Sequence, residues 1–158
     1  MGCDIHLFPE RCDDGKYSVI DIKEDLLGDR NYRIFGFLAG VRNYSGIIPI
    51  SEARGLPKDV SKKVEEYIAK SGFYLHSFSW LSMKELVEFD YDQMTENRRC
   101  TREVITESGF SYQDGGQTCE PGEGEAMTYR EFLGEYFFQE LDRLKEIGTE
   151  RIVFCFDN

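Results

Sequence analysis

The chain has 158 residues, of which 41% are apolar, and its net charge is −11 from 30 acidic and 19 basic side chains. This length suits a single domain with a substantial core, and the apolar share excludes a wholly disordered chain. The surplus of acid disfavours non-specific binding to nucleic acid or to anionic membrane surfaces.

The cysteines and the hydropathy of the sequence indicate a cytoplasmic protein. The chain has five cysteines, an odd number, and no Cys-x-x-Cys pair, so neither a zinc ribbon nor a disulfide framework is expected. We see no apolar run of the roughly 18 residues that a transmembrane helix needs, and no signal-peptide pattern. The acidic surplus itself has three explanations that the sequence leaves open: solubility, docking on a basic protein, and imitation of nucleic acid.

The first quarter of the chain predicts a β-hairpin followed by a helix. Apolar and polar residues alternate over residues 2–8 and again over 17–22, with a turn signal at 13–16. We expect the loop of this hairpin to exceed the two-residue minimum. The compact apolar run 31–41 predicts a short buried helix, although its two glycines weaken it.

The middle of the chain predicts a helix over 57–72, with Pro57 in its first turn and Gly72 at its end. A strand over 73–80 and a helix over 82–89 follow, and the helix begins with a Ser-x-x-Glu capping box. Residues 90–127 are polar and rich in glycine, so we expect a long irregular or mobile segment there.

The end of the chain predicts the longest helix and a closing strand. A second capping box at 128–131 opens a helix that runs to Gly148. Residues 151–157 are apolar on both faces, which is typical of an interior strand. The expected fold is therefore one α+β domain over residues 1–158, with a mixed or antiparallel sheet and helices packed on it.

Two histidines and a carboxylate stand out as groups that could carry chemistry. Asp4 and His6 share one strand face about 7 Å apart, a spacing that suits a metal ion, a base with its orienting partner, or a merely solvated strand face. His76, if its strand is extended, shares a face with Trp80 and could be a ligand, an acid–base residue or a packed side chain. Asp157 ends the interior strand and could be a further metal ligand, a cap or a solvated carboxylate.

The loop residues form a second group of candidates. Arg42 with Asn43, and Arg54, lie in loops beside helix ends and could clamp a carboxylate or a phosphate, or pair with surface acids. Trp80 could form a wall for a flat ligand. Ser79 is a weak nucleophile candidate because no Gly-x-Ser-x-Gly turn surrounds it.

The sequence also resembles a family of small, uncharacterised proteins of phages and bacteria. The blocks that carry the resemblance are Met-Gly-Cys-Asp-Ile-His at 1–6, Leu-Ala-Gly-Val-Arg-Asn at 38–43, Arg-Gly-Leu-Pro at 54–57, His76 with Ser79-Trp80, and Val-Phe-Cys-Phe-Asp-Asn at 153–158. They span nearly the whole chain and contain most of the polar candidates. The resemblance implies a phage or prophage setting and brings no particular activity.

Two functions from different classes remain. The first is a polar pocket for a small anionic, nucleotide-like or phosphate-bearing ligand, with ligand binding by Arg42, Asn43, Arg54, Ser79 and Trp80. In this hypothesis Asp4, His6 and His76 are catalytic, or bind a divalent Mn, Zn or Mg ion with Asp157, and the pocket either hydrolyses a phosphoester or sequesters the ligand. The second is an acidic protein that binds and inhibits a host nucleic-acid enzyme or defence protein.

Overall fold

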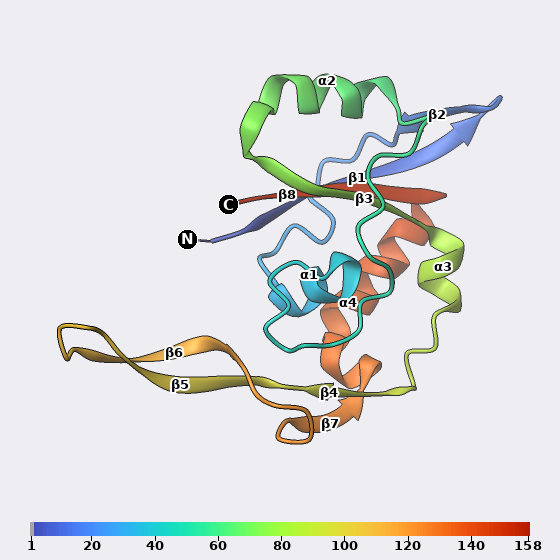
Figure 1. Cartoon of the computed structure of the whole chain (residues 1–158). Helices are drawn as coiled ribbons and strands as arrows, with labels where there is room; N and C mark the ends of the chain where they lie inside the picture. The colour runs from blue at the N-terminus through green and yellow to red at the C-terminus, as the bar shows by residue number, and fades with distance from the viewer. Residues whose placement is uncertain (1) are drawn as a thin grey trace.

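The computed structural model describes residues 2–158, which form an α+β fold of eight strands and four α-helices (Figure 1). The four strands of the main sheet are β1 (Asp4–Asp13), β2 (Lys16–Val19), β3 (Leu75–Ser82) and β8 (Arg151–Asp157). The α-helices are α1 (Tyr32–Ala39), α2 (Lys62–Ser71), α3 (Met83–Glu88) and α4 (Tyr129–Glu146), and a 3-10 turn, η1, covers Gly72–Tyr74. The expected fold class is confirmed.

The main sheet is antiparallel and has the order β2-β1-β8-β3. The last strand of the chain thus lies between the first and the third, as its apolar residues on both faces predicted. The aligned pairs bring the two ends of the described chain together, since Asp4 lies opposite Asp157. Residues 153 positions apart consequently meet at one end of the sheet.

The opening hairpin is tighter than the sequence suggested. Strands β1 and β2 are joined by Asp14 and Gly15 alone, with φ of 49° and 76°. Two successive positive φ angles are typical of a type I′ turn, whose twist matches that of the strands. The expectation of a longer loop was wrong because the Asp-Gly pair supplies this turn by itself.

Helix α2 begins later than predicted. It starts at Lys62 after Ser61, and Pro57 lies in the preceding loop, where its carbonyl accepts a hydrogen bond from the Val60 N–H. Pro57 therefore begins a turn rather than the helix. The end of the helix at Gly72 agrees with the sequence.

Helices cover both faces of the main sheet (Figure 1). Helix α2 lies over one face, and α1 and α4 lie over the other, where the core is packed. There Phe35 meets Phe156 of β8 edge to face at 5.2 Å, and Phe37 meets Phe137 of α4 at 5.6 Å. Such aromatic pairs add to the stabilisation that their buried area provides.

The segment 90–127 was expected to be irregular, but the structure forms two further antiparallel pairs there. These strands are β4 (Met94–Asn97) with β7 (Glu125–Thr128), and β5 (Arg99–Ile105) with β6 (Ser111–Thr118). The β5–β6 hairpin extends away from the rest of the molecule (Figure 1). No strand pattern is visible in the sequence of β5 and β6, because a largely exposed hairpin shows no regular alternation of apolar and polar residues.

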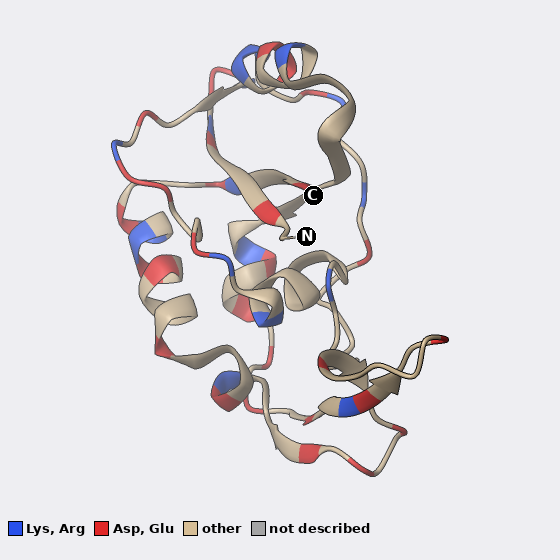
Figure 2. Ribbon diagram, turned by 90° about the vertical axis from the view of Figure 1, so that its left-hand side faces the viewer, with Lys and Arg blue, Asp and Glu red and all other residues tan. Residues whose placement is uncertain are grey.

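Among residues 2–158, no helix has the length and apolar character required to cross a membrane. Acidic and basic residues are distributed over the helices and loops (Figure 2).

Candidate functional site

The site is centred on His6 and Asp157, which the neighbouring strands β1 and β8 place on one face of the sheet. Asp157 is paired with Asp4, two residues before His6, so the three side chains lie on the same face. His6 Nε2 is 2.8 Å from Asp157 Oδ2, and the Asp4 N–H donates to Asp157 Oδ1 at 3.3 Å. The predicted neighbourhood of Asp4 and His6 thus includes Asp157 as well.

Tyr67 of α2 completes a chain of three hydrogen-bonded side chains. Its hydroxyl oxygen lies 2.9 Å from Nδ1 of His6. An ionised Asp157 can only accept, so the bond at Nε2 requires a hydrogen on that nitrogen, and in neutral imidazole Nδ1 is then the acceptor. In that tautomer the Tyr67 hydroxyl donates to His6, and His6 donates to Asp157.

Arg30 forms the charged side of the same site. Its Nε and Nη2 atoms donate to the two carboxylate oxygens of Asp4 at 2.9 and 2.8 Å. The Arg30 guanidinium holds the pKa of Asp4 below its usual range. The geometry is the bidentate one that arginine also uses to bind phosphates.

These groups surround an open cavity of about 620 Å³, which is large enough for a small organic ligand. Its lining includes Asp4, His6, Arg30, Tyr67, Tyr74 and Asp157. A second hollow of about 420 Å³ shares Asp4, His6 and Tyr67 with the first. His6 and Asp157 are about a quarter to a third exposed (27% and 32%), so the hydrogen-bonded chain is accessible from solvent.

His76 does not belong to this site. It is aligned with Phe156, and Ser79 is aligned with Phe154. A step of three residues along β3 thus matches a step of two along β8, which defines a β-bulge between His76 and Ser79. Ser77, inside the bulge, has a φ of 53°. His76 therefore stacks on Phe156, on the core side of the sheet, at 6.2 Å. The expected grouping of His76 with His6 is wrong, and so is its common face with Trp80, because the bulge reverses the alternation.

Arg54, Ser79 and Trp80 form a separate structural cluster. The Arg54 guanidinium binds both carboxylate oxygens of Glu85 and lies over the Trp80 ring at 4.9 Å. The Arg54 N–H donates to the buried Ser79 hydroxyl at 3.0 Å. The ring of Trp80 and the guanidinium of Arg54, which were expected to contact a ligand, thus contact each other.

Arg42 lies at the edge of the candidate site, whereas Asn43 is structural. Arg42 donates to Asn158 Oδ1 at 3.0 Å, and Asn158 lines the cavity. Asn43 bonds the backbone of Ile47 in both directions and closes the loop after α1. Trp80 is aligned with Val153, five strand residues from Asn158, or about 17 Å along β8. Arg42 and Arg54 therefore do not form one clamp.

The predicted set of metal ligands is divided by the sheet. Asp4, His6 and Asp157 share a face, and His76 lies on the other. Within residues 2–158, no group of three or more His, Cys, Asp or Glu side chains has the arrangement of a metal site. A cation held by the first three residues would have to replace the guanidinium of Arg30 at Asp4.

Tyr67 and Arg30 were not identified from the sequence. Tyr67 falls in the apolar stripe of α2, which is typical of packing, and only its need for a hydroxyl partner hinted at another role. Arg30 stands in a polar loop without any motif. Both reach the site through tertiary contacts with β1, which no local pattern encodes.

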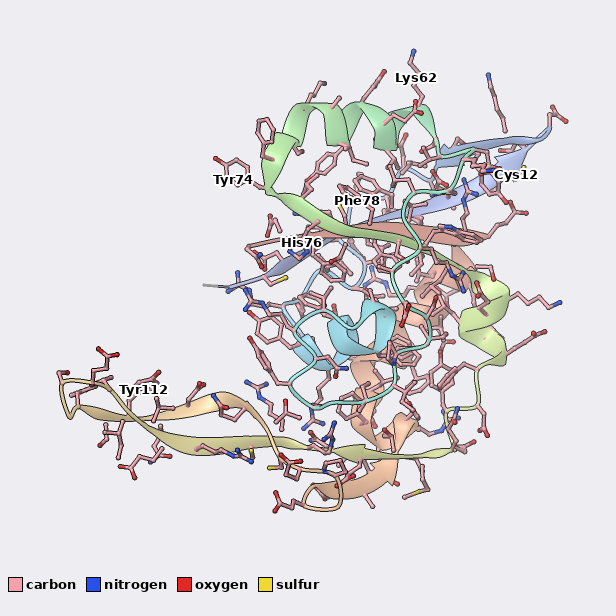
Figure 3. The ribbon with its side chains drawn as sticks, viewed as in Figure 1. Cys12, Lys62, Tyr74, His76, Phe78 and Tyr112 are labelled. Atoms are coloured by element: carbon pink, nitrogen blue, oxygen red, sulfur yellow. The ribbon has the colours of Figure 1, made fainter. Side chains whose placement is uncertain are left out.

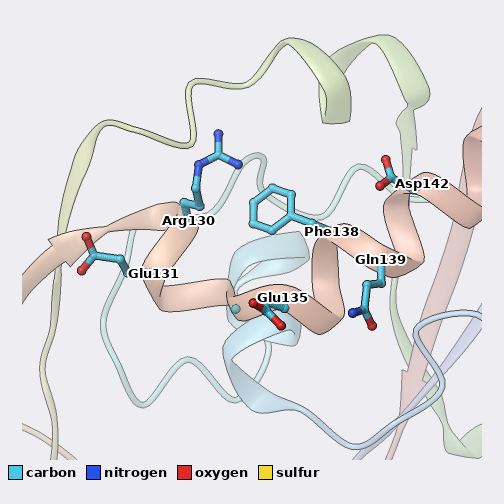
Figure 4. A pocket seen from close by; sticks show the side chains of 7 residues that line it. Arg130, Glu131, Glu135, Phe138, Gln139 and Asp142 are labelled. Atoms are coloured by element: carbon cyan, nitrogen blue, oxygen red, sulfur yellow. The ribbon is translucent and has the colours of Figure 1, made fainter.

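A hollow of similar size, about 610 Å³, lies beside α4, where Gly134 interrupts the helical geometry with a φ of 79° (Figure 4). Its arginine, Arg130, is paired with Asp92, as Arg30 is with Asp4, and covers the Phe138 ring at 4.9 Å. The lining residues contain neither histidine nor cysteine. The cavity at His6 is therefore the stronger candidate.

The fold and this site define an α+β protein with an accessible Tyr–His–Asp hydrogen-bonded chain. No protein-family model, curated protein or solved structure matches the chain. Function is accordingly inferred from the geometry of the chain itself.

Proposed function

We propose that the chain binds a small phosphate-bearing, nucleotide-like ligand in the cavity next to His6, and that His6 and Tyr67 catalyse hydrolysis of a phosphoester there. The observation that carries the proposal is the chain Tyr67–His6–Asp157, with hydrogen-bond distances of 2.9 and 2.8 Å, open to a 620 Å³ cavity. A base held by a carboxylate and aimed at a hydroxyl is the arrangement of activated hydroxyl groups in many enzymes.

Each member of the chain has a distinct role in this reaction. A water oxygen attacks phosphorus while its proton passes to the Tyr67 oxygen and the Tyr67 proton passes to His6 Nδ1. Asp157 stabilises the imidazolium that results. As the ester P–O bond breaks, the imidazolium returns a proton through Tyr67 to the departing alkoxide, so that an alcohol and a phosphate are released.

Arg30 supplies the binding energy for the anion. Two of its nitrogens bind Asp4 and its guanidinium lines the cavity, so its remaining N–H groups can donate to phosphate oxygens. Arg42 can add a second positive charge from the rim through its position beside Asn158. The phage or prophage setting implied by the resemblance remains a prediction.

The test compares two tyrosines that line the same cavity. Tyr67→Phe removes the hydroxyl that contacts His6, and Tyr74→Phe removes an exposed hydroxyl of the same kind. With bis-p-nitrophenyl phosphate and a panel of nucleotides as substrates, Tyr67→Phe should lower kcat/KM about 100-fold and Tyr74→Phe by less than about threefold. Equal activities of the two variants would exclude Tyr67 from the reaction.

The histidines provide a second matched pair, because the chain has only two. His6→Gln should abolish hydrolysis, and His76→Gln should preserve it in the folded fraction. Each assay is run with EDTA and with added Mn²⁺ or Zn²⁺, which distinguishes this mechanism from the metal-assisted one. Activity that requires the metal would overturn the proposed proton path.

The same cavity without turnover would sequester its ligand. Thermal melting against the nucleotide panel distinguishes the two outcomes, since a ligand at 100 Kd adds about 2.7 kcal/mol to the free energy of unfolding. A shift that Arg30→Gln removes, without release of phosphate or alcohol, would indicate sequestration.

A further inference from the structure

The hairpin of β5 and β6, residues 99–118, contributes no lining residue to the site just described. We call this hairpin the arm. Its two strands pair only with each other among residues 2–158. The arm is anchored at its base, where the Arg99 guanidinium lies over the Tyr44 ring at 5.4 Å and Thr118 donates to the Tyr44 carbonyl at 2.8 Å. From there it extends away from the main sheet (Figure 1).

The outer part of the arm exposes apolar side chains. Phe110 is 66% exposed, Tyr112 46% and Ile105 69%. Val104 is aligned with Tyr112, and the Thr106 N–H donates to the Phe110 carbonyl, so Val104, Phe110 and Tyr112 lie on one face of the ribbon. Figure 3 shows Tyr112 on the arm, away from the rest of the chain.

This part of the arm is also free at its edges. Over residues 103–113, the hydrogen bonds within the described chain connect the arm only with itself. Both strands therefore present backbone N–H and C=O groups to solvent. A two-stranded hairpin is only marginally stable alone, and a third strand adds both hydrogen bonds and apolar cover.

The charge of the segment indicates what kind of third strand fits. Residues 103–118 of the arm contain three acidic side chains, Glu103, Glu107 and Asp114, and no Lys, Arg or His. Nucleic acid would be repelled by this charge even though the aromatic rings could stack on bases. A second copy of the arm would be repelled in the same way, whereas a basic strand is attracted.

We propose that the outer arm binds an extended segment of another protein in which basic and apolar residues alternate. The segment adds a strand to the edge of the arm, places its apolar side chains on Val104, Phe110 and Tyr112, and turns its basic side chains toward the acidic residues. Glu103 is adjacent to Val104 in strand β5, and Glu107 lies in the turn that precedes Phe110, so both place negative charge on the outer arm.

The test uses a short fluorescent peptide of alternating lysine and valine, with an all-lysine peptide of equal length as the charge-only probe. Binding is measured by fluorescence anisotropy against the wild type and the double variant Phe110→Ser/Tyr112→Ser. The alternating peptide should bind the double variant about tenfold more weakly, and the all-lysine peptide should bind both proteins equally. The matched control is Phe73→Ser, a fully exposed aromatic residue outside the arm, which should bind like the wild type.

Two further variants distinguish loss of the binding contacts from unfolding of the hairpin. Phe110→Leu/Tyr112→Leu retains apolar area and should restore binding to within about threefold of the wild type. Glu103→Gln/Glu107→Gln should weaken both peptides and reduce the salt dependence of binding.

The proposal fails if the alternating peptide does not bind the wild type, or binds wild type and double variant equally. It also fails if sedimentation shows a dimer of the wild type that the double variant dissociates, because the apolar face would then serve self-association. Stronger binding of single-stranded DNA than of the alternating peptide would instead assign the rings to base stacking.

Discussion

The Nε2 atom of His6 lies 2.8 Å from Oδ2 of Asp157, although 151 positions separate the two residues in the chain. With an ionised Asp157 and a neutral imidazole, this contact places the hydrogen on Nε2 and leaves Nδ1 as the acceptor that faces Tyr67. The relationship exists because the first and last strands of the main sheet are neighbours.

The tautomer of His6 can be observed directly. We expect neutral His6 to carry its hydrogen on Nε2, and Asp157→Ala to give a mixture of both tautomers, because the carboxylate that selects one is gone. Nitrogen-15 NMR of the imidazole rings measures this, and His76→Gln removes the other histidine signal. A wild-type hydrogen on Nδ1 would reverse the donor and acceptor at Tyr67 and contradict the proposed proton path.

The buried ion pair of Glu10 and Arg151 should matter far more for stability than a surface pair. Glu10 is fully buried, accepts from Arg151 Nε at 2.7 Å and accepts from the Ser61 N–H at 2.9 Å. Glu10→Gln removes the buried charge partner of Arg151 and leaves it only the exposed Asp59, so it should lower the free energy of unfolding by about 3 kcal/mol in urea denaturation.

The surface comparison for that experiment is Asp92→Asn. Asp92 pairs with Arg130, and both side chains are more than half exposed. This variant should cost at most about 1 kcal/mol. Similar losses in the two variants would mean that the Glu10 pair is not buried in solution.

The pair of Arg54 and Glu85 predicts a dependence of stability on acid. The Arg54 guanidinium lowers the pKa of Glu85 from 4.5 to about 2. Because the folded-state pKa is depressed, this stabilisation is complete above about pH 4.5 and is lost as the pH falls toward 2. With allowance for solvent screening, it amounts to about 1 kcal/mol.

Denaturation of wild type and Glu85→Gln between pH 7 and 2 measures this effect. The difference in stability between the two proteins should be largest at neutral pH and shrink below pH 4.5. Glu88→Gln, on the same helix, controls for the loss of one carboxylate. A difference that grew toward low pH would have the opposite sign and contradict the ion pair.

The five cysteines should fall into two groups in alkylation of the native protein. Cys3 and Cys155 are buried, and burial, with a contribution from Asp157, raises the pKa of the Cys155 thiol to about 12. Iodoacetamide should therefore label Cys12, Cys100 and Cys119 first, as read by peptide mass spectrometry. Rapid labelling of Cys155 would show that β8 is not an interior strand.

Local patterns in the sequence were sufficient for most elements of the fold. The apolar alternation of residues 2–8, the capping box at Ser82 and the two apolar faces of residues 151–157 each predicted the element that forms, because these signals act over one strand or one helical turn. The strands of the arm were not predicted, because both faces of the arm are largely exposed to solvent and its sequence therefore lacks a regular apolar alternation.

The sequence by itself also determined that Asp4 and His6 share a face, since strand geometry alternates side chains with a fixed period of two. Only the tertiary structure decided their partners. The order of strands in the sheet brought Asp157 to His6, the packing of α2 brought Tyr67, and a one-residue bulge in β3 turned His76 to the opposite face. Such long-range pairings depend on the packing of the whole chain, which no local pattern contains.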